Sequence, residues 1–208
     1  MRVCIAEVEG GQPHYMEAVV REVRALIRLA RGDGQGALAD SERALTLARA
    51  AQDPQALYPA LAFQSQILLT VGLRAEAVPF VDELLALLPS RGSGFVSYWA
   101  STLAVVLTAL GRRDEVKPVI ETAAISTRWL DAARAYAAGA FEEAADVYAE
   151  IGALPDEAFA RLRGAETLLD AGRRVDVDAQ LQQALAFYRS VGATAYTREG
   201  EALLAASA

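Results

Sequence analysis

The chain is poor in the residues that build reactive sites. Its 208 residues include one cysteine, one histidine, one lysine and no asparagine. A single cysteine excludes an intrachain disulfide, and one histidine with one cysteine falls short of the usual ligand set of a transition-metal site. The absence of asparagine removes any N-glycosylation acceptor. These shortages predict no metal and no cofactor, and they are typical of a protein of the reducing cytoplasm.

Long apolar runs and concentrated positive charge are also missing. The longest apolar runs, such as residues 103–110, are too short to cross a bilayer, and residues 1–9 lack the features of a signal peptide. The 20 Lys and Arg residues are scattered among 27 Asp and Glu residues, which gives a net charge of −7 at pH 7. Nucleic-acid-binding proteins usually carry a basic stripe, so we expect no direct contact with nucleic acid and none with a membrane.

What the chain has in abundance is helix-forming sequence. Hydrophobic residues make up 53% of it, and apolar residues recur three and four positions apart. The breaks fall at Gly, Pro and Asp clusters, such as Asp53-Pro54, where an N-cap precedes a proline at the first helical position. We therefore expect about a dozen helices paired as antiparallel hairpins, with no strand.

A repeated pattern organises these helices. Glycines occur at Gly32, Gly72, Gly111, Gly139 and Gly172. Five residues after them come Ala37, Ala77, Val116, Ala144 and Val177, and seven residues further come Ala44, Leu84, Ala123, Ile151 and Ala184. Each glycine is predicted to end the first helix of a hairpin in the left-handed conformation, and the small or branched residue after it lets the two helices cross closely. An internal repeat of this length indicates a stack of hairpins.

The segment of residues 132–151 identifies the closest pattern. Ala132, Gly139, Phe141, Ala144 and Tyr148 lie at positions where this segment resembles the tetratricopeptide repeat (TPR). The resemblance implies an all-α, right-handed α–α superhelix. We expect a single domain over residues 1–208 with about five irregular units, at residues 13–52, 53–89, 94–126, 127–152 and 155–191, and a terminal helix at 193–207.

Two further segments narrow the resemblance. Residues 36–57 and 182–208 resemble the C-terminal repeat region of bacterial cyclase-linked AAA- or STAND-type ATPases and LuxR-type regulators. This resemblance implies a regulatory or sensor region of a signalling or transcription-regulating ATPase, or a fragment derived from one. The chain contains no Walker A sequence, no cyclase aspartate pair and no DNA-binding unit. The ATPase and output activities of such proteins are therefore not implied.

Catalysis finds no support in the residue pattern. Cys4 and His14 have no third partner for nucleophilic chemistry, and the glycine-rich segment of residues 32–36 lacks both a preceding strand and the Gly-Lys-Ser/Thr of a phosphate loop. Paired acids such as Glu142-Glu143 are typical of a solvated helix face near a helix start. We therefore expect that the protein is not an enzyme.

The family resemblance also implies where a partner would bind. In TPR stacks the first helices of the hairpins line a concave groove. Carried onto this chain, the candidate groove residues are Glu22, Gln66, Tyr98, Ser101, Thr108, Trp129, Tyr136 and Glu166. The set lacks the lysines and asparagines with which some TPR proteins clamp a peptide carboxylate. Its aromatic rings would suit an apolar peptide or helix, but the same rings could instead fill the core between hairpins.

These observations predict a non-catalytic protein–protein interaction module that binds a protein or peptide, such as a domain of a larger signalling ATPase. Two alternatives stay open. One is a sensor domain that holds a small-molecule effector in a closed pocket, and the other is a structural repeat domain that self-associates. The shape of the groove distinguishes the first two, because a peptide needs an open groove and an effector needs an enclosed one.

Overall fold

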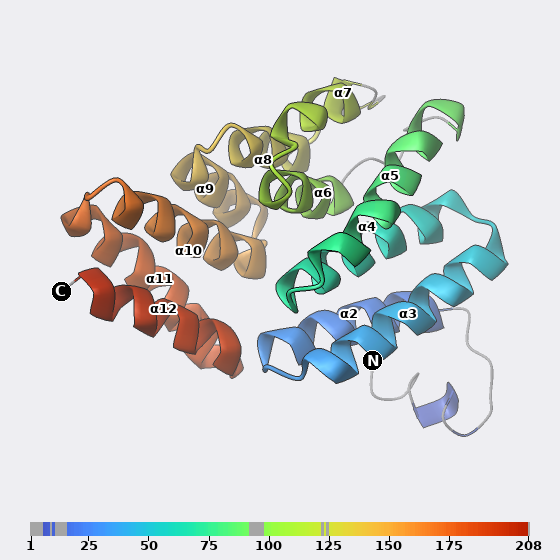
Figure 1. Cartoon of the computed structure of the whole chain (residues 1–208), viewed down its shortest axis with the longest axis horizontal. Helices are drawn as coiled ribbons and strands as arrows, with labels where there is room; N and C mark the ends of the chain where they lie inside the picture. The colour runs from blue at the N-terminus through green and yellow to red at the C-terminus, as the bar shows by residue number, and fades with distance from the viewer. Residues whose placement is uncertain are drawn as a thin grey trace. The chain divides into compact units, whose positions relative to one another are not determined.

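The computed structural model describes residues 6–8, 10, 16–91, 98–121, 123 and 125–207, and of these the side chains of 89–91, 98, 174, 175 and 207 are left out. The described residues form α-helices and one 3-10 helix, and they contain no strand (Figure 1). Successive helices pack on one another as hairpins joined by short turns. The predicted all-α fold of stacked helical hairpins is therefore confirmed. The helix predicted within residues 1–9 falls largely outside the described residues.

The chain divides into two compact units. Unit 1 comprises Met1–Leu29 and Asp33–Phe95, and unit 2 comprises Ala30–Gly32 and Val96–Ala208. The helices of the first half are α2 (Glu17–Ala30), α3 (Gly34–Ala51), α4 (Pro54–Thr70) and α5 (Arg74–Arg91). The single domain that the repeat pattern predicts, and the hand of its superhelix, stay predictions.

Unit 2 contains the remaining helices. They are α6 (Tyr98–Ala109), the 3-10 helix η1 (Arg113–Glu115), α7 (Val116–Glu121), α8 (Arg128–Ala137), α9 (Phe141–Ile151), α10 (Leu154–Asp170), α11 (Arg174–Val191) and α12 (Thr194–Ser207). The second helix of the α6–α7 hairpin is only six residues long. This short helix accounts for the close spacing between the third and fourth glycines of the repeat.

The repeat glycines end the first helix of each hairpin as the pattern predicts. All five have a positive φ, between 73° and 87°. At Gly139 the N–H donates to the Tyr136 carbonyl, and the next N–H, of Ala140, donates to the Ala135 carbonyl. These bonds satisfy carbonyls that the helix end leaves open, and a residue with a Cβ would be strained in that conformation.

The small or branched residues five positions after the glycines are buried. Ala37, Ala77, Ala144 and Val177 are fully buried, and Val116 is 3% exposed. Their burial is what a close crossing of paired helices requires, and the crossing itself stays a prediction. The predicted N-cap is confirmed, because Asp53 accepts a 2.9 Å hydrogen bond from the N–H of Gln55.

The core of unit 2 lies between its hairpins. One apolar cluster is built on Leu162, Leu181, Leu185 and Tyr188 from α10 and α11. A second centres on Tyr136 and Tyr148 from α8 and α9 and extends to α10. Because α6 contacts α8 and α10 contacts α12, the first helices of successive hairpins present neighbouring residues on one face. That face is where the predicted groove residues of unit 2 belong.

Candidate functional site

The eight predicted groove residues are distributed over both units. Glu22 and Gln66 lie in unit 1, on α2 and α4, whereas the other six lie in unit 2. The side chain of Tyr98 lies outside the described residues. Gln66, Thr108, Trp129 and Glu166 are half-buried, and Glu22, Ser101 and Tyr136 are buried.

Glu22 is a buried carboxyl in an apolar setting. It is 3% exposed, and its Oε1 has no hydrogen-bond partner among the described residues. Burial raises the pKa of this carboxyl to about 8, because water no longer stabilises the charged form. At neutral pH the group is therefore largely protonated.

In unit 2 the predicted residues of α6 and α8 meet around Tyr148. The ring of Trp129 lies 6.1 Å from the Tyr148 ring, and Tyr136 packs edge-on against Phe141 at 4.9 Å. Ser101 is 1% exposed, and its hydroxyl makes no contact that meets strict hydrogen-bond geometry. It nevertheless lies close enough to the Tyr148 hydroxyl to lower the pKa of Tyr148, against the rise that burial causes. Tyr136 is thus a core ring, whereas Trp129 packs on the core and keeps part of its surface accessible.

The sixth predicted residue, Glu166, belongs to a cluster that the sequence did not reveal. Its carboxylate pairs with the Arg163 guanidinium at 2.8 Å, and the same guanidinium is bound to Glu199 of α12. Arg163 also lies over the Phe159 ring, with 5.0 Å between its Cζ and the ring centroid. Phe159 in turn packs edge-on against Tyr196 of α12 at 5.8 Å. One arginine thus joins two helices through two carboxylates and an aromatic pair.

The TPR positions that give Glu166 on α10 also give Leu162, four residues earlier, as a groove position. This side chain is instead fully buried in the core between α10 and α11. Arg163, the next residue, is accessible instead. The spacing of Asp156, Phe159, Arg163 and Glu166 is three or four residues, which places them on one side of a helix. That spacing was the available signal for Arg163.

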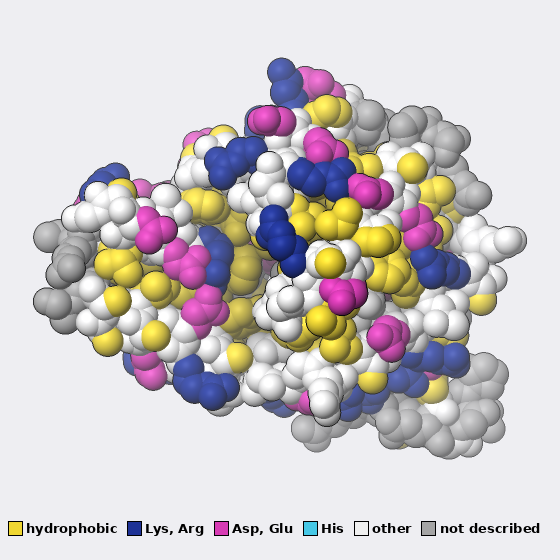
Figure 2. Space-filling view, viewed as in Figure 1, with side chains coloured by type: hydrophobic (Ala, Val, Ile, Leu, Met, Phe, Trp, Pro, Cys, Tyr) yellow, Lys and Arg dark blue, Asp and Glu magenta, His cyan; other side chains and the backbone are white. Residues whose placement is uncertain are grey.

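The residues just described form one surface, which we call the A-helix face of unit 2. Val105, Trp129 and Phe159 all pack, partly exposed, on the core around Tyr136 and Tyr148, and Phe159 continues the surface to α12. Figure 2 shows hydrophobic side chains among acidic and basic ones over α10 and α12. The face comprises Val105, Thr108, Trp129, Asp156, Phe159, Arg163, Glu166, Tyr196 and Glu199, whereas Ser101 and Tyr136 of the same helices are buried.

Burial shifts the titration of Asp156, Glu166 and Tyr196 toward the neutral form. Burial raises the pKa of Asp156 to about 6, against a smaller opposing effect of a backbone hydrogen bond. Burial also raises the pKa of Glu166, which Arg163 opposes and the charges of Glu199 and Asp170 reinforce. The pKa of Tyr196 rises to about 12, again mainly through burial. Burial is the largest cause of the raised pKa in all three groups, because it disfavours the charged form.

A separate cleft lies between α9, α10 and α11. Its volume is about 770 Å³, its floor includes Phe141, Val147 and Leu168, and none of the eight predicted residues lines it. Acidic side chains of α9 form one wall: Glu142, Glu143, Asp146 and Glu150. Glu150 is bound by Arg128, and Asp146 accepts a 3.2 Å hydrogen bond from Arg161.

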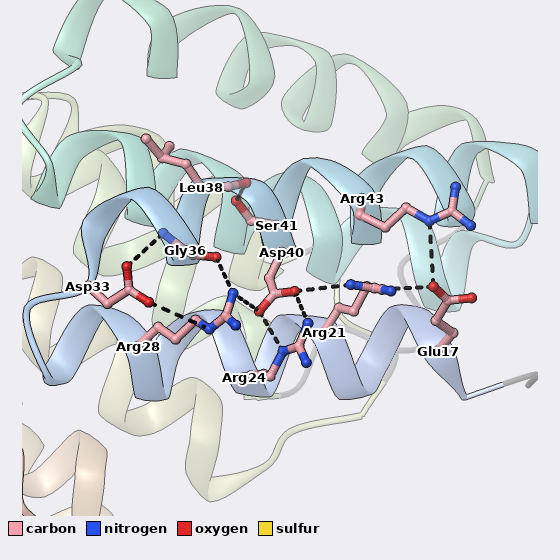
Figure 3. Close-up of polar contacts among 10 residues, drawn as sticks. All are labelled: Glu17, Arg21, Arg24, Arg28, Asp33, Gly36, Leu38, Asp40, Ser41 and Arg43. Carbon is pink, nitrogen blue, oxygen red and sulfur yellow. Dashed lines mark hydrogen bonds and ion pairs between the residues drawn. The ribbon is translucent and has the colours of Figure 1, made fainter. Parts of the chain in front are cut away.

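A second polar cluster lies in unit 1 (Figure 3). Arg21, Arg24 and Arg28 follow one side of α2, and all three contact the carboxylate of Asp40 on α3 at distances between 2.5 and 3.1 Å. Asp40 is 2% exposed. Burial alone would raise its pKa, but the hydrogen bonds and charges of these arginines hold the pKa of Asp40 below its ordinary value. This cluster pins the α2–α3 hairpin through a fully satisfied carboxylate.

Two kinds of site are absent from the described part of the chain. No group of three or more His, Cys, Asp and Glu side chains there is placed to hold a metal ion. None of the described helices combines the length and the apolar character needed to span a membrane. Cys4 and His14 lie outside the described residues.

Comparison with known proteins identifies no family for this chain. No protein-family model matches the chain, and no curated protein matches it. Among solved structures, it is similar to a kinesin-light-chain candidate from Podosopora anserina with nearly identical TPR-like repeats. The identity is 16%, the match covers 88% of this chain and 99% of that one, and the TM-score is 0.47. A likeness of this size says nothing about partners, so the functional argument rests on the residues themselves.

Proposed function

We propose that the protein is a non-catalytic interaction module and that the A-helix face of unit 2 is its docking surface for a protein or peptide. The observation that carries the proposal is that Trp129, Phe159 and Tyr196 are only half-buried, and that Phe159 and Tyr196 lie beside the Arg163 ion pairs. Aromatic rings and arginine are the residue types that dominate interface energetics. An extended face of this kind suits a peptide better than an enclosed effector.

The role of this module within a larger protein is inferred from the sequence alone. A regulatory region of a signalling or transcription-regulating ATPase is an expectation from the resemblance of residues 36–57 and 182–208. Docking on unit 2 is compatible with such a role, because occupancy of a repeat surface can be passed to neighbouring domains.

Selection of binding peptides tests the proposal directly. Phage-displayed peptides are selected on the full chain, and their Kd is measured for the wild type, Trp129→Ala and Phe159→Ala. The matched control is Phe80→Ala, since Phe80 of unit 1 also lies under an arginine, 5.9 Å from Arg49 Cζ. We expect a loss of about tenfold or more, or about 1.4 kcal/mol, for the two unit 2 variants and little change for the control. Failure to enrich any peptide, or equal losses in all three variants, overturns the proposal.

A further inference from the structure

We propose that the A-helix face of unit 2 selects a basic segment, whose lysine or arginine side chain lies over the Phe159 and Tyr196 rings and against the surrounding carboxylates. The inference rests on the proposed docking surface and names the chemistry of its partner. Two observations support it: the charge balance of the face and its aromatic rings.

The charge balance leaves negative charge unmatched. Glu166 and Glu199 share the single guanidinium of Arg163, and Asp170 is near enough to raise the pKa of Glu166 further. Asp156 lies on the same side of α10, nearer its start. A backbone hydrogen bond stabilises its charged form, and no cation among the described residues does so. A further positive charge would satisfy these carboxylates, whereas an incoming carboxylate would meet like charges.

The aromatic rings already accept a cation. Arg163 lies 5.0 Å above the Phe159 ring, which is the distance range of cation–π contacts. Tyr196 packs edge-on against Phe159 at 5.8 Å, and both residues are half-buried. A second cationic side chain can therefore rest on these rings while its charge faces Glu199 or Glu166, as peptide-binding surfaces commonly arrange it.

The α9–α11 cleft supplies a matched control for this inference. It is also lined by acids, so simple attraction of a basic peptide to an acidic protein would act there as well. Replacing Glu142, Glu143 and Glu150 by glutamine removes the same charge as Asp156→Asn, Glu166→Gln and Glu199→Gln together. The two triple variants therefore have equal net charge and differ only in which surface loses it.

The experiment uses three fluorescein-labelled peptides of about twelve residues that share their apolar positions and differ in carrying Lys, Gln or Glu at the others. Binding to the full chain is followed by fluorescence anisotropy. We expect the Lys peptide to bind about tenfold more tightly than the Gln peptide and the Glu peptide to bind least. The Asp156, Glu166 and Glu199 triple variant should lose most of this preference, and the cleft variant should keep it.

Two results overturn the inference. One is a Gln or Glu peptide that binds the wild type as tightly as the Lys peptide does. The other is an equal loss in both triple variants, which would mean non-specific attraction. Because Arg163 loses its partners in the triple variant, Asp156→Asn alone serves as the second variant, and it must weaken the Lys peptide selectively. If peptides selected on the wild type depend on Trp129 and Phe159 but are neutral or acidic, the docking surface stands and only its basic preference fails.

Discussion

The two units pair their carboxylates and arginines in opposite proportions. In unit 1, three arginines of α2 surround one carboxylate, Asp40, within a single hairpin. In unit 2, one arginine, Arg163, is shared by Glu166 of its own helix and Glu199 of the next hairpin. The first cluster closes on a carboxylate that is 2% exposed, whereas the carboxylates of the second are each 35% exposed.

This difference separates a structural cluster from a binding surface. A buried carboxylate with several good partners fixes the register of two helices, and little of it is left to offer a ligand. A half-exposed cluster with more carboxylates than cations, beside half-buried aromatic rings, can still form contacts with a partner. The comparison therefore assigns the cluster around Asp40 to stability and the cluster around Arg163 to recognition.

The largest expected effect is that of Asp40→Ala on stability. The substitution leaves the guanidiniums of Arg21, Arg24 and Arg28 crowded together without their common acceptor. Breaking a buried pair by removing one partner costs about 3–5 kcal/mol, and urea unfolding of the variant should show a loss of this size. A loss under about 1 kcal/mol would contradict the structural role of this cluster.

The control for Asp40 is Asp33→Asn, because Asp33 is half exposed and its replacement can still accept the hydrogen bond from the Gly36 N–H. A pH series adds a second check. Since the pKa of Asp40 is held below its ordinary value, its stabilisation is present above the unfolded-state pKa and is lost as the pH falls through the folded-state pKa. Wild type and Asp40→Asn should therefore converge in stability in acid.

A second prediction uses Glu22, another buried carboxyl of unit 1. Glu22 has no partner for its Oε1, and burial raises its pKa from 4.5 to about 8. A raised pKa means that stability is fully present below pH 4.5 and is lost as the pH rises toward 8, because only the unfolded chain ionises freely in that window. Glu22→Gln should equal the wild type at pH 4 and exceed it by about 3 kcal/mol at pH 7.

Urea unfolding at several pH values measures this gap for Glu22. Glu42→Gln is the control, since Glu42 is an exposed residue of the same unit and its replacement should change stability little at any pH. A gap that stays constant between pH 4.5 and 8 would show that Glu22 finds a partner in solution, and the contrast with Asp40 would then disappear.

The fold followed from the sequence because its signals are local. A glycine with positive φ ends the first helix of a hairpin, and a small residue five positions later permits the crossing, so Gly139 and Ala144 predict a turn without knowledge of the rest. The pairing of Asp40 with arginines of α2 was not predictable in this way. The arginine spacing indicates a shared helix side, but only the hairpin register decides which acceptor meets it.

The candidate site was less predictable because it depends on helix rotation. A fixed TPR register places Leu162 in the groove, but the apolar side of α10 turns this leucine fully into the core and Arg163 becomes accessible. Tyr196 and Glu199 were not predicted because they lie in the terminal helix, outside the five units of the repeat. Helix rotation and neighbouring hairpins are long-range properties, and local spacing carries little information about them.

The smallest predicted effect is that of Arg163→Met, and it addresses the comparison most directly. Methionine keeps the apolar contact with Phe159 but leaves Glu166 and Glu199 facing each other without a cation. Because these carboxylates are half exposed, we expect a loss of only about 1–2 kcal/mol at pH 7 in urea unfolding. The arginine is a cause that lowers the pKa of Glu166, so without it the carboxyl is neutralised more readily and the loss should shrink as the pH falls. The double variant Arg163→Met with Glu199→Gln should recover most of the stability, since it removes the repulsion. A loss as large as that of Asp40→Ala, or one that the double variant does not recover, would make Arg163 a structural clamp like the arginines of α2 and would remove the basis for assigning recognition to this face.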